Sequence, residues 1–192
     1  MSTATPTDIV LEPVEREELT DVARRIQAAF APAVEKETGH ALPEPIPSDA
    51  ELARSFDDPA AEVLHVVVDG ERVGGAVVLV DRDSRRNTLE LFFIDVGREG
   101  GGLGRRAWAA IEARYPEVDV WETFTPLFEL RNIHFYINVC GFRAVEFFHE
   151  GHPLPEPPSG RAGHPEGDRF PGEDRGFRFE KVRGASTPSA VV

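Results

Sequence analysis

The stretch Glu90–Gly104, which reads Glu-Leu-Phe-Phe-Ile-Asp-Val-Gly-Arg-Glu-Gly-Gly-Gly-Leu-Gly, decides how the fold of this 192-residue chain is interpreted. Its apolar run Leu91–Ile94 is typical of a strand buried on both faces, and we expect that strand to span Thr88–Val96. Glycines follow at once, and Leu103–Tyr115 has the apolar spacing of a helix, ended by Pro116. A strand, a glycine-rich turn and a helix are therefore contiguous.

The glycine turn has the properties of a phosphate-binding site. Glycines between a strand and a helix let consecutive backbone N–H groups point at one place, and the helix N-terminus adds about half a positive charge there. Arg98, Arg105 or Arg106 can add full charges. A P-loop is excluded, because Arg105-Arg106 stands where Lys followed by Ser or Thr is required. A dinucleotide-binding fingerprint is disfavoured, because no Gly-x-Gly-x-x-Gly opens a parallel βαβ unit. The turn Gly100–Gly104 is thus the predicted phosphate site.

Two helices are predicted upstream of the hairpin region. Glu15–Ala31 places apolar residues on one helical face, and Pro32 should stop or kink this helix. Ser48 followed by Glu51 has the spacing of a capping box and predicts a short helix that runs to about Phe56. The chain upstream of the turn therefore begins with helical structure.

Strands and a further helix complete the predicted elements. Val63–Val68 and Val73–Val80 are rich in β-branched residues, and Asp69-Gly70 between them predicts a hairpin. Beyond the glycine turn we expect a strand at Val118–Phe124, a helix at Pro126–Cys140 capped by Thr125 and closed by Gly141, and strands at Phe142–Phe148 and Gly176–Val182. We expect one domain over residues 8–183, with residues 1–7 and 184–192 as flexible tails.

The composition narrows the class of protein. The chain has 34 acidic and 21 basic residues, and its net charge of −13 opposes non-specific binding to nucleic acid. One cysteine, Cys140, excludes a disulfide framework and a multi-cysteine zinc site. No apolar stretch approaches the roughly 20 residues of a membrane span, and the N-terminus lacks a secretory signal. We expect a cytoplasmic protein with neither nucleic-acid nor membrane partners.

The order of elements and three motifs resemble the GNAT acetyltransferase superfamily. The motifs are the buried strand Glu90–Val96 with the turn Gly100–Gly104, the helix stretch Arg131–Tyr136, and the ending Cys140-Gly141-Phe142. The resemblance implies an α/β (α+β) fold, a mixed, mostly antiparallel sheet of six to seven strands flanked by about four helices. It also implies an acetyl-CoA-dependent N-acetyltransferase.

The resemblance assigns residues to the cofactor and to catalysis. Those expected to contact acetyl-CoA are Ile94, Val96, Arg98, Glu99, Gly100, Gly101, Gly102, Leu103, Gly104, Arg105 and Asn132. In the implied direct transfer, the acceptor amine attacks the thioester, and Glu90, Glu122 or a water chain removes its proton. Backbone N–H groups around Ile94–Val96 stabilise the oxyanion, and Tyr136 protonates the leaving thiolate.

The chain departs from the family pattern at two places. Glu99 stands where the family has Gln or Arg, and Arg98 is the neighbouring cation that can substitute for it. Tyr136 and Gly141 are five positions apart where four are usual, a difference that a one-residue bulge at the helix end would absorb. These departures leave a second hypothesis open, a catalytically weak acyl-CoA-binding sensor or interaction module.

The long segment His149–Arg175 and its histidines carry the last predictions. Its length favours a role beside the pocket for a small-molecule or peptide amine, or at a partner surface such as that of a homodimer. The spacing of His149, His152 and His164 matches no standard zinc site, so we expect no metal.

Overall fold

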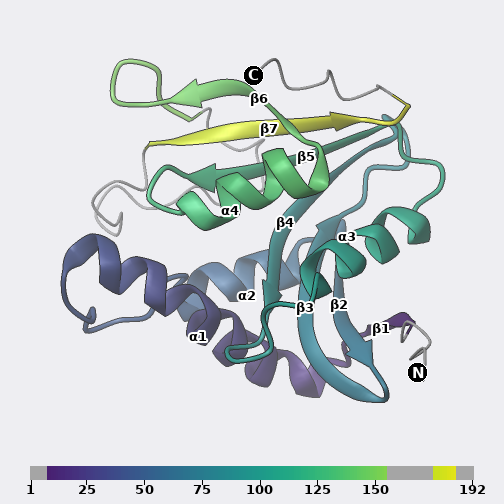
Figure 1. The fold of residues 1–192 in the computed structure, drawn as a ribbon, viewed down its shortest axis with the longest axis horizontal. Helices are drawn as coiled ribbons and strands as arrows, with labels where there is room; N and C mark the ends of the chain where they lie inside the picture. The colour runs from purple at the N-terminus through teal and green to yellow at the C-terminus, as the bar shows by residue number, and fades with distance from the viewer. Residues whose placement is uncertain (1–7, 155–174, 185–192) are drawn as a thin grey trace, which may run out of the picture. The chain divides into compact units, whose positions relative to one another are not determined.

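The computed structural model describes residues 8–154 and 175–184. Its strands form one sheet in the order β1-β2-β3-β4-β5-β7-β6, together with helices α1–α4 (Figure 1). The predicted fold class, α/β with a mixed and mostly antiparallel sheet, is confirmed. The chain divides into two compact units, and strand β4 (Arg86–Ile94) contributes its first three residues to the second unit and the rest to the first. The single domain over residues 8–183 stays a prediction.

The first unit is built on an antiparallel hairpin. Strand β2 (Ala61–Val68) pairs with β3 (Glu71–Leu79), and Asp69 and Gly70 between them have positive φ values of 53° and 78°. Asp-Gly favours such a turn, so the predicted hairpin is confirmed. Strand β1 (Ile9–Pro13) pairs with β2 on its other edge and was not predicted, since five residues ahead of the first helix give little periodicity.

Helices α1 and α2 precede this hairpin. A short 3-10 turn leads into α1 (Leu19–Thr38), which continues through Pro32 and ends at Gly39. The sequence predicts that Pro32 stops or kinks this helix. The stop is wrong, because the proline removes only one helical hydrogen bond while Val34, two residues later, is buried in the continuing helix. The capping box before α2 (Asp49–Asp57) is confirmed by reciprocal bonds between Ser48 and Glu51.

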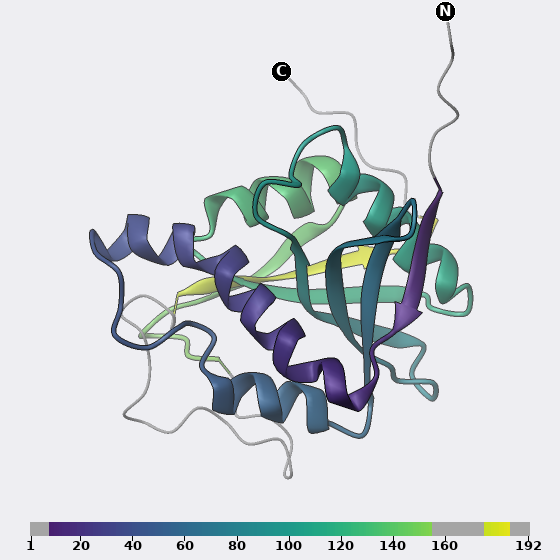
Figure 2. The ribbon, with the colours of Figure 1, turned by 90° about the horizontal axis from the view of Figure 1, so that it is seen from below.

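The apolar run of β4 separates the two cores of the first unit. Leu91 and Phe93 pack with α1 and α2, which lie together in Figure 2. Phe92 and Ile94 pack instead with residues of β2, β3 and helix α3 (Leu103–Arg114). The four residues thus contact clusters on both faces, as the sequence predicted.

The second unit contains strands β5 (Val120–Pro126), β6 (Arg143–Phe148) and β7 (Gly176–Val182), with β7 antiparallel to both neighbours. Strand β5 also pairs in parallel with the first three residues of β4. The strand predicted at Gly176–Val182 is confirmed with its bounds.

The helix predicted at Pro126–Cys140 begins later than expected. Thr125 and Pro126 are the last residues of β5, where they pair with β7, so a helix cap at Thr125 is wrong. Thr123 and Thr125 are both buried on one face of β5. This burial favours an extended conformation of Thr125 over a helix-capping one. The helix consists of α4 (Leu130–His134) and a π-helical segment, η2 (Phe135–Cys140), which closes at a left-handed Gly141. The π-helix is the bulge that the five-residue spacing from Tyr136 to Gly141 requires.

Candidate active site

The glycine turn adopts a conformation that requires glycine. Gly100, Gly101 and Gly102 have φ values of 108°, 56° and 71°. The Leu103 N–H donates to the Gly100 carbonyl at 3.0 Å, and the Arg106 N–H donates to the Gly102 carbonyl at 3.1 Å. The turn is thus fixed by its own backbone and leads directly into the first turn of α3, where amide groups converge and the helix dipole favours an anion.

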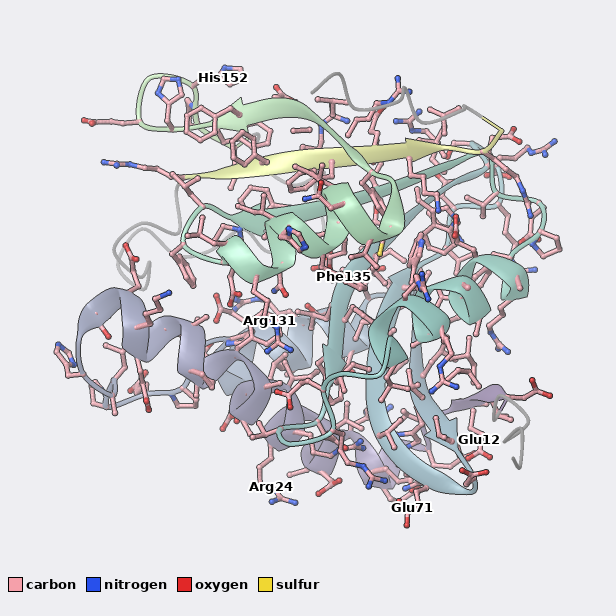
Figure 3. All side chains as sticks on the ribbon, in the orientation of Figure 1. Glu12, Arg24, Glu71, Arg131, Phe135 and His152 are labelled. Atoms are coloured by element: carbon pink, nitrogen blue, oxygen red, sulfur yellow. The ribbon has the colours of Figure 1, made fainter. Side chains whose placement is uncertain are left out.

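Charged side chains around the turn are arranged differently from the expectation. The Glu99 carboxylate accepts a hydrogen bond of 2.7 Å from the Gly97 N–H, so it is directed back to its own loop. Arg98 forms an ion pair with Glu71 of β3, which is labelled in Figure 3. Glu71 therefore competes with any bound anion for Arg98. Arg105 is exposed in the first turn of α3.

The end of β4 is held by an ion pair that the sequence did not reveal. Arg25 of α1 donates to both carboxylate oxygens of Asp95, at 3.0 and 2.8 Å, and lies over the Phe93 ring at 5.5 Å. The Asp95 N–H donates to Val73 of β3 at 2.9 Å. Of the predicted oxyanion donors around Ile94–Val96, the Asp95 N–H is thus already engaged. No local pattern links Arg25 and Asp95, which are 70 positions apart.

Glu90 lies on β4 within the first unit. Its side chain is exposed, and the hydroxyl of Ser55 on α2 lies 3.5 Å from its carboxylate. This position leaves the carboxylate accessible to solvent.

Tyr136 is enclosed by aromatic rings of the second unit. Its ring packs at 5.5 Å from both Phe135 and Phe142 and at 6.0 Å from Phe179. Its hydroxyl forms a hydrogen bond with Thr123. Burial raises the pKa of Tyr136 well above its ordinary value near 10, so the phenol keeps its proton at neutral pH, as a proton donor must.

Glu122 belongs to an ion-pair network. Arg86 bonds Glu122 and Glu180, and the Arg178 Nη1 atom lies 3.3 Å from Glu122 and 2.5 Å from Glu180. Two guanidinium groups thus occupy the Glu122 carboxylate. The same network continues from Arg178 to Glu146, which also contacts His152 (Figure 3).

Asn132 and Glu129 lie together at the start of α4. The Asn132 side-chain nitrogen donates to Glu129 at 3.2 Å. The Glu129 side chain is only 5% exposed, and burial raises its pKa to about 7, opposed by the charge of Arg131. No sequence pattern singles out Glu129, because its burial depends on tertiary packing.

The remaining predictions concern metal and membrane. In residues 8–154 and 175–184, no cluster of three or more His, Cys, Asp or Glu side chains is placed to hold a metal ion. His164 and most of the segment His149–Arg175 lie outside the described residues. No helix in the described part of the chain is long and apolar enough to cross a membrane.

Comparison with known proteins identifies the family. The sequence pattern described as "Acetyltransferase (GNAT) family" matches residues 25–142, which contain the glycine turn, Tyr136 and Gly141. The chain belongs to the GNAT family of acetyltransferases. It is also 41% identical over 182 residues to the uncharacterized protein YrkN of Bacillus subtilis (strain 168), covering 95% of this chain and 97% of that protein.

Solved GNAT structures share the fold at low sequence identity. The ribosomal-protein-S18-alanine N-acetyltransferase from Escherichia coli is 13% identical with a TM-score of 0.62, covering 96% of this chain and 99% of that one. A Bacillus subtilis acetyltransferase in complex with CoA is 16% identical with a TM-score of 0.56, covering 92% of this chain and 98% of that one. The predicted membership of the GNAT superfamily is confirmed, and acetyl transfer is the chemistry of this family.

Proposed function

We propose that this GNAT protein transfers the acetyl group of acetyl-CoA to a primary amine of a small molecule or peptide by direct attack. The observation that carries the proposal is the backbone of Gly100–Gly102, three consecutive glycines with positive φ values that lead directly into the start of α3. The CoA complex of the Bacillus subtilis acetyltransferase and the N-acetyl transfer named for the Escherichia coli enzyme support it.

The turn supplies most of the cofactor-binding energy in this proposal. The backbone N–H groups of Gly101, Gly102, Gly104 and Arg105 donate to the diphosphate oxygens, while the Leu103 N–H is already bonded to the Gly100 carbonyl. The α3 dipole and the Arg105 guanidinium complement the charge of the diphosphate. Because the protein is strongly acidic as a whole, this local positive potential must act within a Debye length of about 10 Å. Salt should therefore weaken cofactor binding.

The chemical steps use one donor for the oxyanion and one for the thiolate. The Ile94 and Val96 N–H groups are the proposed oxyanion donors, since the Asp95 N–H bonds Val73. Tyr136, which carries its proton at neutral pH, gives that proton to the departing thiolate. Cys140 is buried, and direct transfer needs no acyl-cysteine. A lone buried cysteine also suits a reducing compartment, so we propose cytoplasmic action.

The experiment is release of CoA thiol from acetyl-CoA in the presence of a panel of polyamines, amino acids and peptide N-termini. We expect amine-dependent thiol production together with an acetylated product found by mass spectrometry. Saturable acetyl-CoA binding without amine-dependent thiol release would show a binding module instead of an enzyme.

A further inference from the structure

Glu129 is a buried carboxyl group with one unsatisfied oxygen. Its Oε2 atom accepts from the Asn132 side chain at 3.2 Å, while Oε1 is buried and has no hydrogen-bond partner among the residues that the structure describes. Buried carboxyl oxygens almost always accept a hydrogen bond, and an unsatisfied one costs about 1–3 kcal/mol. Such a group needs a functional explanation.

The backbone holds this carboxyl group in a defined place. The Glu129 N–H donates to the Pro126 carbonyl at 3.1 Å, and the Glu129 carbonyl accepts from the Ile133 N–H at 3.0 Å. Glu129 thus joins the end of β5 to the first turn of α4. Its charge acts on Tyr136 farther along the same helical stretch. The pKa of Tyr136 is raised mainly by burial, and also by the charges of Cys140 and Glu129. An unsatisfied acid and the proposed proton donor are coupled within one unit.

The electrostatic surroundings suit a group that exchanges protons near neutral pH. Burial raises the pKa of Glu129 to about 7, and the charge of Arg131 acts in the opposite direction. Arg131 lies on α4, and Phe135 begins the π-helical segment that follows it (Figure 3). A base whose pKa matches the working pH is the most effective one, because it is both available and strong enough to take a proton.

We propose that Glu129 is the catalytic base of acetyl transfer, its Oε1 atom taking the proton of the acceptor ammonium group directly or through one water. This rests on the proposed function. The ammonium N–H bond breaks, its proton moves to Glu129, and the nitrogen lone pair forms the C–N bond. The C–S bond then breaks with its electrons going to sulfur. Tyr136 protonates the sulfur and regains the second nitrogen proton, and Glu129 releases its proton to solvent.

The two carboxylates proposed from sequence are less suited to this role. Glu122 forms ion pairs with both Arg86 and Arg178, so a substrate ammonium group would have to displace a guanidinium group from it. Glu90 is exposed to solvent, and the Ser55 hydroxyl lies 3.5 Å from its carboxylate. Glu129 differs from both in being buried and having an oxygen available for a new hydrogen bond.

The test compares Glu129→Gln, Glu90→Gln and Glu122→Gln with the exposed control Glu117→Gln. Turnover and KM are measured from pH 5.5 to 9 with an amine that the wild-type protein acetylates, and acetyl-CoA affinity is measured by calorimetry. For Glu129→Gln we expect turnover at pH 7 to fall about 100-fold or more, the rise of rate through about pH 7 to disappear, and acetyl-CoA affinity to change less than twofold. Glu129→Asp should restore part of the rate together with the pH dependence.

Two results would overturn the assignment. One is a Glu129→Gln variant with wild-type turnover, or with the wild-type pH dependence at a uniformly lower rate, as a purely structural residue would give. The other is a wild-type turnover that does not rise with pH near pH 7. This result can be obtained even if the Glu129→Gln variant fails to fold. Loss of the proposed function itself is recognised separately, as absence of amine-dependent thiol release in the wild-type protein.

Discussion

Replacing Gly100 by alanine tests whether the backbone of the turn, and not its mere flexibility, binds the cofactor. The added methyl group would meet no atom within 4 Å, so its effect is purely conformational. At φ = 108° an L-residue is strained by about 1–3 kcal/mol. Because the turn is exposed, we expect it to relieve this strain by changing shape, which moves the amide groups away from the diphosphate.

The expected loss follows from that strain. Since 1.4 kcal/mol corresponds to a factor of ten, the Kd for acetyl-CoA should rise about tenfold to a hundredfold. The matched control is Gly39→Ala, which has a similarly positive φ of 77° and open space around it, but ends α1. Both variants should lose some thermal stability, and only Gly100→Ala should lose affinity in calorimetry. Equal acetyl-CoA affinity in Gly100→Ala and the wild-type protein would refute the reasoning, as would an equal loss in Gly39→Ala.

Three further outcomes are expected. Tyr136→Phe should lower turnover about tenfold or more, with acetyl-CoA affinity unchanged in calorimetry. The control Tyr115→Phe, which removes the hydrogen bond to Glu62, should alter stability alone. Unchanged turnover in Tyr136→Phe would remove Tyr136 from the mechanism. Glu99→Gln should tighten acetyl-CoA binding about two- to fivefold at low salt, and weaker binding would show that Glu99 is needed to shape the loop. Because burial raises the pKa of Glu129 from 4.5 to about 7, the folded protein still binds a proton that the unfolded chain has lost, so the free energy of unfolding decreases as pH rises from about 4.5 to 7. In urea unfolding, the wild-type protein should lose about 2–3 kcal/mol of stability over this range relative to Glu129→Gln. Parallel pH curves for the two proteins would contradict this.

Local signals predicted much of the fold. The capping box at Ser48, the Asp69-Gly70 turn and the alternation in Gly176–Val182 depend on neighbouring residues, and each is confirmed. The one-residue excess before Gly141 likewise indicated the bulge that η2 provides. Where one element depends only on its own sequence, the pattern was sufficient.

Predictions that depended on distant contacts were less successful. Pro32 is tolerated in α1, which has buried residues on both sides of it, and Thr125 stays in β5 because β7 pairs with it. The Arg25–Asp95 pair and the burial of Glu129 arise only once the chain is folded, so no spacing in the sequence predicts them. The site assignments for Glu90, Glu122 and Tyr136 stay predictions.

The central claim concerns the amide groups of the glycine turn, and NMR reports on them directly. In ¹H–¹⁵N spectra recorded during titration with CoA, hydrogen bonding to phosphate should shift the amide protons of Gly101, Gly102 and Gly104 downfield, more than those of Gly39 and Gly70. We expect these shifts to saturate together. Saturating binding that leaves the resonances of the turn unchanged would contradict it.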